Sequence, residues 1–148
     1  MAGEIISGRL TDGGHELQQR VYFEDTDFSG RVYHARYLHF MERGRSDFLR
    51  LIGVRHRELA DKGLSFAVSH MEIDFRRAAS IDDVVTVHTK LKEMTGARIV
   101  LDQSVLRESE VLVHASVTVA LVSAAGRAVR LPPRVCAAFA ASGSSSDR

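Results

Sequence analysis

The sequence predicts an α+β domain in which an antiparallel sheet curls around one long helix. Residues 34–52 carry apolar side chains at helical spacing, whereas residues 66–121 alternate between apolar and polar side chains at the period of a β-strand. The spacers between the alternating segments are short, and a parallel return would need a dozen or more residues. The strands are therefore expected to pair antiparallel, with the helix against one face of their sheet.

Bulk composition excludes several classes of protein. The 148 residues suffice for one domain, and 20 basic against 19 acidic residues give a formal net charge of +1. A nucleic-acid-binding domain would carry a basic excess. The single cysteine, Cys136, is expected to be a packing residue; it excludes an internal disulfide or CxxC site and fits a reducing compartment. Without a signal peptide or an apolar run of roughly 20 residues, we expect a cytoplasmic protein with no membrane span and no nucleic-acid partner.

The chain divides into a core and two short ends. Residues 1–16 are polar and Gly-rich, with a turn at Thr11–Gly14, and are expected to form a flexible N-terminal segment. Residues 141–148 contain a Ser-rich stretch and are expected to form a flexible C-terminal tail. Residues 17–140 then form the single folded domain.

The long helix is predicted over His34–Ile52. Gly53 follows it as a plausible C-terminal cap. Gly44 lies on the apolar face although glycine costs about 1 kcal/mol against alanine inside a helix, which suggests close approach to another backbone. The apolar face comprises Tyr37, Met41, Gly44, Phe48 and Ile52.

The remaining elements complete the predicted order. A short strand over Gln18–Phe23 precedes the helix, and a second short helix or turn covers Arg55–Lys62. Four long strands follow at about residues 66–76, 85–91, 99–105 and 111–121. A single helix with one apolar face sits most economically across the concave face of such a sheet. This is the hotdog arrangement of five or six strands around a central helix, although periodicity alone also allows other α+β sandwiches.

The stretch from Val21 to Arg45 carries the chemistry. It consists of a strand, the acidic run Glu24-Asp25-Thr26-Asp27, a turn at Gly30 and the start of the long helix. A helix N-terminus presents unpaired N–H groups and partial positive charge, which can hold the oxyanion of an acyl-transfer reaction. A carboxylate seven residues earlier can face the same point, and a thioester needs little more because thiolate is a good leaving group.

This stretch resembles the 4-hydroxybenzoyl-CoA thioesterase-like branch of the hotdog superfamily, and in particular its YbgC-type, Tol–Pal-associated acyl-CoA thioesterases. The resemblance spans about 120 residues, including a weaker match at Phe75-Arg76-Arg77-Ala78 and Asp82-Asp83. The matching motifs are Tyr22-Phe-Glu-Asp-Thr-Asp27, Gly30, Val32-Tyr33-His34-Ala35, Tyr37-Leu38 and Phe40-Met-Glu42-Arg43-Gly-Arg45.

The resemblance implies a role for each matching residue. Asp27 would be the catalytic carboxylate, selected over Asp25 and Glu24 because the motif places glycine three residues after the active aspartate. The backbone N–H near His34 would polarise the thioester carbonyl, and the His34 side chain would assist. Asp27 could act as nucleophile or as general base, and the sequence does not decide between them. The expected substrate is a short- to medium-chain or aromatic acyl-CoA.

Further residues are assigned to substrate binding. Phe28-Ser29, Arg31 and Arg36 depart from the common family pattern. Phe28 could narrow the acyl pocket, and the two arginines add charge near its mouth. Gly30 and Tyr33 belong to the same expected site. The CoA phosphates call for basic residues, for which the candidates are Arg76, Arg77, Lys90, Lys92 and Arg98.

No cofactor is expected beyond the CoA of the substrate. No metal site is expected either, since the scattered histidines show no paired ligand spacing on one element (His39, His56, His70, His88 and His114). Glu42 and Arg45 are interpreted as a structural ion pair or as helix surface.

Alternative functions and partners remain open. A non-catalytic hotdog module could bind acyl-CoA or acyl carrier protein, or contact Tol–Pal-linked envelope proteins. A hydratase would need an acid–base pair for which no motif is present. Long edge strands favour a homodimer, and the family resemblance implies further association into a homotetramer.

Overall fold

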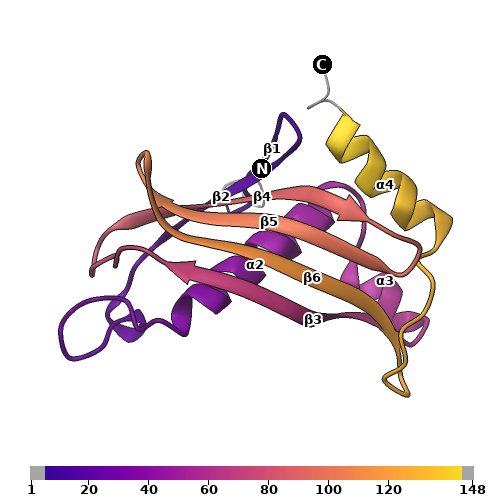
Figure 1. Ribbon diagram of the computed structural model, residues 1–148, viewed down its shortest axis with the longest axis horizontal. Coiled ribbons are helices and arrows are strands. Elements are labelled where there is room, and N and C mark those ends of the chain that lie inside the picture. The colour runs from indigo at the N-terminus through magenta and orange to yellow at the C-terminus, as the bar shows by residue number, and fades with distance from the viewer. Residues whose placement is uncertain (1–5, 145–148) are drawn as a thin grey trace.

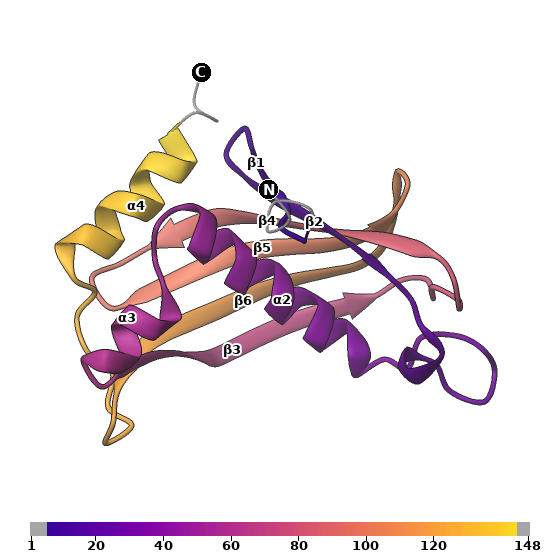
Figure 2. The same cartoon turned by 180° about the vertical axis from the view of Figure 1, so that it is seen from behind.

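The computed structural model describes residues 6–144 and consists of one six-stranded antiparallel sheet with helices on one face and at one edge (Figures 1 and 2). The strand order is β1-β2-β4-β5-β6-β3. The strands are β1 (Arg9–Thr11), β2 (Gly14–Arg20), β3 (Leu64–Phe75), β4 (Val84–Met94), β5 (Arg98–Arg107) and β6 (Glu110–Ser123). The helices are η1 (Phe23–Asp25), α2 (Arg36–Leu51), α3 (His56–Asp61) and α4 (Pro133–Ser144).

The four long strands and the central helix confirm the predicted architecture. All five strand pairings are antiparallel. β3 follows the two helices in the chain, yet it pairs only with β6 and forms one edge of the sheet. A β-bulge between Val68 and His70 interrupts its register with β6. Figure 2 shows α2 lying across the sheet on the face seen there.

The N-terminal segment differs from the prediction. Residues 9–16 form β1 and the start of β2, joined by a two-residue turn inside the expected Thr11–Gly14 turn, so this part of residues 1–16 is not a flexible segment. The first strand of the core was also misplaced: it begins at Gly14 and ends at Arg20, and Phe23–Asp25 forms the 3₁₀ turn η1. Residues 1–5 lie outside the described residues.

A buried polar contact explains why this hairpin is ordered. The His15 side chain is fully buried, and its Nε2 lies 2.7 Å from Oδ2 of Asp47 on α2. The Gly8 N–H donates to the same carboxylate at 2.7 Å, and Arg50 donates to its other oxygen at 2.8 Å. Burial alone would raise the pKa of Asp47, but the bonds from His15, Gly8 and Arg50 outweigh it and lower this pKa. The hairpin is thus held against α2 by a polar contact that the periodicity of the sequence does not predict.

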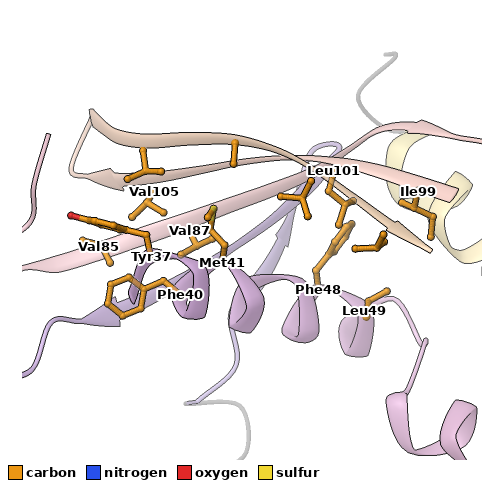
Figure 3. Packing of buried hydrophobic residues seen from close by; sticks show 14 of the residues in the cluster. Tyr37, Phe40, Met41, Phe48, Leu49, Val85, Val87, Ile99, Leu101 and Val105 are labelled. Atoms are coloured by element: carbon orange, nitrogen blue, oxygen red, sulfur yellow. The ribbon is translucent and has the colours of Figure 1, made fainter. Parts of the chain in front are cut away.

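The core lies between α2 and the sheet. Figure 3 shows side chains of α2 meeting those of β4 and β5. Phe40, Met41 and Phe48 are at most 1% exposed. Gly44 permits the closest approach, because a Cβ at this position would lie 2.8 Å from Cγ1 of Val87 on β4. The predicted close approach at Gly44 is confirmed, and the atoms met are those of a side chain rather than of a backbone.

The C-terminus contributes a helix that the periodicity did not reveal. α4 runs to Ser144, so residues 141–144 are helical and only residues 145–148, which lie outside the described part, remain of the expected tail. Phe139 on α4 is buried and packs edge-on against Phe48, with ring centroids 6.1 Å apart. Cys136 is partly buried beside this contact. Within residues 6–144, no helix is long and apolar enough to cross a membrane.

Replacing Gly44 by alanine tests the close contact between α2 and β4. Alanine would gain about 1 kcal/mol of helix propensity, but overpacking against Val87 costs about 1–3 kcal/mol. We expect Gly44→Ala to lower the free energy of unfolding in urea by about 1–2 kcal/mol. In Gly44→Ala/Val87→Ala the two losses should be less than additive; stabilisation by Gly44→Ala, or full additivity, would contradict the contact.

Candidate active site

Asp27 lies on the loop between η1 and α2 with its side chain in solvent. Its Oδ1 accepts hydrogen bonds from the Ser29 N–H at 2.8 Å and the Ser29 hydroxyl at 2.5 Å. These bonds, led by that from the hydroxyl, lower the pKa of Asp27. The carboxylate is therefore ionised at neutral pH and held in a fixed orientation.

The loop is shaped by backbone contacts around Gly30. The Asp27 N–H donates to the Arg31 carbonyl at 2.9 Å, and the Gly30 N–H donates to the Asp27 carbonyl at 3.1 Å. Gly30 has φ +80°, while a Cβ added to it would meet no atom within 4 Å, so glycine is needed here for its backbone conformation rather than for space. The turn predicted at Gly30 is therefore a tight reversal that brings Arg31 back beside Asp27.

The start of α2 presents free backbone donors. The N–H groups of Arg36, Tyr37 and Leu38 donate to the carbonyls of residues 33–35, whereas those of His34 and Ala35 make no hydrogen bond within residues 6–144. The helix begins at Arg36, two residues after the predicted start. The exposed His34 ring lies 4.6 Å from the Tyr33 ring and 5.9 Å from the Phe75 ring. Two oriented donors at a helix N-terminus can stabilise negative charge on a carbonyl oxygen.

A buried ion pair fixes the loop to the helix. Asp25 is 3% exposed, and its Oδ1 accepts from Nε and Nη2 of Arg36 at 3.0 and 2.7 Å. Its other oxygen accepts from the Tyr22 N–H at 2.9 Å. The sequence had suggested that Arg36 adds charge near the mouth of the acyl pocket. Arg36 is instead engaged in this ion pair and supplies no free charge there. Asp25 is likewise committed to structure, whereas Asp27 and Glu24 are both exposed, and Glu24 lies 3.7 Å from Arg36.

Three predicted site residues meet in one shallow groove. The groove has a volume of about 250 Å³ and lies where the start of α2 faces the end of β3. Arg76 and Arg77 are exposed at its rim, but Arg76 pairs with Asp74 at 3.2 Å and Arg77 with Glu110 at 3.0 Å. The lining residues are Val32, His34, Tyr37, Phe75, Arg76, Arg77 and Ala78. The groove thus joins a helix N-terminus, aromatic rings and two arginines.

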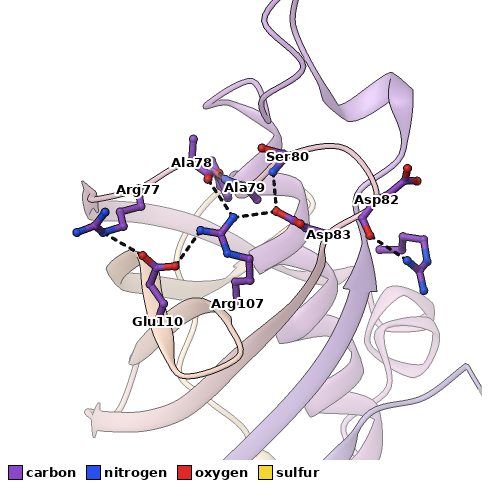
Figure 4. Close-up of polar contacts among 10 residues, drawn as sticks. Arg77, Ala78, Ala79, Ser80, Asp82, Asp83, Arg107 and Glu110 are labelled. Carbon is purple, nitrogen blue, oxygen red and sulfur yellow. Dashed lines mark hydrogen bonds and ion pairs between the residues drawn. The ribbon is translucent and has the colours of Figure 1, made fainter.

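The segment that follows Arg77 is held by a polar network (Figure 4). Arg107 donates to the Ala78 carbonyl at 3.5 Å, to Asp83 at 2.9 Å and to Glu110 at 2.8 Å. The Ser80 N–H also donates to Asp83, and these bonds together lower the pKa of that carboxyl. The Ala79 N–H donates to the Tyr37 hydroxyl at 2.9 Å. The network therefore fixes one wall of the groove to both the sheet and α2.

Other predicted residues do not line this groove. Phe28 is fully exposed, and Gly30 and Tyr33 lie on the same loop as Phe28, outside the lining of the groove. Lys90, Lys92 and Arg98 are exposed toward the far end of β4 and the start of β5, away from residues 76–83. No hydrogen bond joins the Asp27 carboxylate to His34 within residues 6–144. A single chain therefore brings His34, Arg76 and Arg77 together and leaves Asp27 and Phe28 on a solvent-facing loop.

Sequence reasoning missed the residues that orient the site. Ser29 follows Asp27 by two positions, a spacing typical of Asx-turns, which could have indicated its role. The Asp25–Arg36 pair and the bonds from Arg107 to Ala78 and Asp83 join residues 11 to 29 positions apart and left no local signal. In the described part of the chain, no group of three or more His, Cys, Asp or Glu side chains is placed to hold a metal ion.

Replacing Ser29 tests what holds the Asp27 carboxylate. Ser29→Ala removes the hydroxyl that contributes most to the lowered pKa, so the pKa of Asp27 should rise toward its ordinary value in an NMR titration of the carboxyl carbon. Thr26→Ala is the matched control, since the Thr26 hydroxyl donates to the Phe23 carbonyl instead. An unchanged Asp27 pKa in Ser29→Ala would show that the hydroxyl does not set it.

Comparison with known proteins identifies the family. The sequence pattern of the thioesterase-like superfamily matches residues 21–139. The chain is 41% identical over 132 residues to an acyl-CoA thioesterase YbgC of Haemophilus influenzae, covering 88% of this chain and 97% of that protein. It is 37% identical over 101 residues to an acyl-CoA thioester hydrolase YbgC of Escherichia coli, covering 64% and 75%.

Solved structures agree with this assignment. A probable thioesterase from Bartonella henselae is 48% identical with a TM-score of 0.77, covering 80% of this chain and 99% of that one. A 4-hydroxybenzoyl-CoA thioesterase variant in complex with 4-hydroxybenzoyl-CoA has a TM-score of 0.80 at 21% identity, covering 86% and 99%, a likeness of fold. The predicted hotdog fold is confirmed, and the chain belongs to the thioesterase-like superfamily as an enzyme of the YbgC thioesterase type.

Proposed function

We propose that this protein hydrolyses an acyl-CoA to the free acid and CoA, with Asp27 as the catalytic carboxylate. The observation that carries the proposal is the accessible carboxylate of Asp27, with its lowered pKa, on the loop that leads into a helix N-terminus where two N–H groups make no hydrogen bond within residues 6–144. Such a pair supplies a negatively charged group for attack and donors for the oxyanion. The names of the YbgC relatives support the acyl-CoA part of the proposal.

The lowered pKa keeps the Asp27 carboxylate ionised, which both direct attack and general-base catalysis require. In direct attack, an Asp27 oxygen bonds to the thioester carbon, the C–S bond breaks and CoA leaves as a thiolate. Water then hydrolyses the mixed anhydride and restores the carboxylate. The N–H groups of His34 and Ala35 are assigned to the carbonyl oxygen, and the His34 side chain to orienting the acyl group or water.

Arg76 and Arg77 are the best-placed candidates for the CoA phosphates. Both lie at the rim of the groove that His34 lines, and both are exposed. Their present partners, Asp74 and Glu110, are themselves exposed or partly exposed, so phosphate groups could replace them at low cost. The length of the acyl group and the need for any partner protein, such as acyl carrier protein or Tol–Pal components, stay predictions.

We further propose that two chains pair through β3. This 12-residue strand is hydrogen-bonded on one side only among the described strands, and Val68 and Phe75 on it are 45% and 46% exposed. A long edge strand readily pairs with a second copy through its free backbone groups, and Val68 and Phe75 add exposed apolar side chains to this one. Pairing would place the other chain beside the groove, where it could complete a site that one chain leaves open. The tetramer remains an implication of the family resemblance.

Thiol release from a panel of acyl-CoA esters tests the reaction. Wild type should hydrolyse at least one aliphatic or aromatic member, and Asp27→Ala and Asp27→Asn should lower kcat by two or more orders of magnitude, because the attacking group is lost. His34→Ala should lower kcat less, since its assigned donor is the backbone N–H. Circular dichroism would check that the variants are folded.

Two results would reject this function. Saturable acyl-CoA binding without turnover would favour a non-catalytic hotdog module, and turnover indifferent to Asp27 would remove it from the mechanism. A single turnover in ¹⁸O-labelled water tests for the anhydride. Label in the Asp27 carboxylate indicates that the anhydride formed and that water attacked its aspartyl carbonyl.

Light scattering tests the proposed dimer. Val68→Lys places a charge on the β3 edge and should convert a dimer into a monomer. Leu10→Lys is the matched control, because Leu10 is 48% exposed on β1 at the opposite edge of the sheet and its change should leave the mass unaltered. A monomeric wild type, or a dimer that persists in Val68→Lys, would contradict pairing through β3.

A further inference from the structure

A second, more enclosed pocket lies beyond the His34 groove, between α2 and β3. Its volume is about 120 Å³, and most of its wall is apolar. The apolar lining comprises Leu49, Phe66, Ala67, Val68, Leu101, Val119 and Phe139, and the polar lining Glu42, Arg45, Ser46 and His56. The groove uses the start of α2 and the end of β3, whereas this pocket uses the second half of α2 and the start of β3. Both therefore lie along one seam between the two elements.

Arg45 is the charged group on the wall of this pocket. Its side chain is partly buried, and burial lowers the pKa of its guanidinium. Its Nη1 donates to Oε1 of Gln103 at 3.1 Å. Gln103 is fully buried and is oriented by donating its own amide to the Met41 carbonyl at 3.0 Å and to the Thr89 hydroxyl at 2.9 Å. With its amide nitrogen engaged in this way, Gln103 directs its side-chain oxygen toward Arg45 and so positions the guanidinium.

The donors of Arg45 exceed the acceptors within reach. A guanidinium has five N–H donors, yet within residues 6–144 only the neutral Gln103 oxygen accepts from it. Glu42, one turn earlier on α2, attracts the guanidinium but forms no ion pair with it in the described chain and is exposed at the pocket rim. Desolvating a cation without a bonded counter-group is unfavourable. The pocket is therefore arranged to receive an oxygen acceptor from outside the chain.

We propose that Arg45 binds an oxygen at the far end of the acyl group, so that the enzyme selects acyl thioesters ending in a hydroxyl or carboxylate over those ending in a methyl group. This inference rests on the proposed acyl-CoA hydrolysis. The groove at the helix N-terminus and the pocket both lie beside α2 and β3, and the nine residues of helix from Arg36 to Arg45 rise about 14 Å. The apolar wall suits the alkyl or aryl part of the acyl group, while the guanidinium suits its polar end.

Matched thioesters that differ only in a terminal methyl, hydroxyl or carboxylate test the proposal. For wild type, kcat/KM should be roughly tenfold to a hundredfold higher for an oxygen-ended member than for the methyl-ended one of equal length. The better of the hydroxyl and carboxylate members identifies the natural end group. In Arg45→Met, which keeps much of the side-chain volume, this preference should disappear while the methyl-ended ester is still hydrolysed. Arg45→Lys should retain part of it.

Arg43→Met is the control for losing a charge from α2. Arg43 lies on the opposite side of the helix and donates to Gln19, so its loss should leave the preference intact. Equal rates for all three wild-type esters, or equal losses on all three in Arg45→Met, would overturn the proposal and make Arg45 structural. The oligomer mass of Arg45→Met is also measured by light scattering. A changed mass with an unchanged preference for oxygen-ended esters would overturn the proposal, because it would assign Arg45 to a contact between subunits.

Failure of this inference is distinguishable from failure of the proposed function. Asp27-dependent hydrolysis without end-group preference rejects only the role of Arg45. If no ester is hydrolysed, calorimetric binding of the three esters to wild type and Arg45→Met supplies the same comparison. Tighter binding of an oxygen-ended ester to wild type alone supports the pocket, and equal binding rejects it.

Discussion

The structure depends on how closely α2 packs against β4. Gly44 allows the helix to approach Val87, and Phe40, Met41 and Phe48 fill the space on either side. The main contacts of α2 with the sheet are made with β1, β2, β4 and β5. The consequence appears on the other side, where the start of α2 and the edge strand β3 enclose a seam with exposed apolar residues. Close packing on one side of the helix thus creates the space available for a substrate on the other.

Polar contacts then divide the acidic residues at the helix start into two kinds. Asp25 is buried and accepts from Arg36, which ties the loop to the first turn of α2. Asp27, two residues later, is in solvent, and within residues 6–144 its carboxylate accepts hydrogen bonds from Ser29 alone. Asp83 serves structure again, through Arg107 and the segment after Arg77. The proposed catalytic carboxylate therefore lies next to a buried aspartate whose ion pair fixes the loop.

The two ends of the seam differ in a way that suits a thioester. The His34 end offers backbone donors and arginines, which suit a carbonyl and phosphates. The Arg45 end offers apolar walls and a guanidinium that, within residues 6–144, donates a hydrogen bond to Gln103 alone. An edge strand forms one wall of both sites, so a second chain paired on β3 would close the seam and exclude water from it. Oligomer formation and substrate selection would then depend on the same strand.

The sequence by itself determined the long helix, four strands and the loop that carries Asp27. Each is encoded locally, by apolar spacing in α2, by alternation in β3 to β6, and by the motif around Asp27 that carries the family. Only the tertiary structure decided the rest. The N-terminal hairpin is ordered by the contact of His15 with Asp47, and α4 is ordered by the packing of Phe139 against Phe48. The guanidinium of Arg45 is oriented by its hydrogen bond to Gln103. These contacts join residues 32 to 91 positions apart, or depend on burial, and no local pattern encodes a partner that distant in the chain.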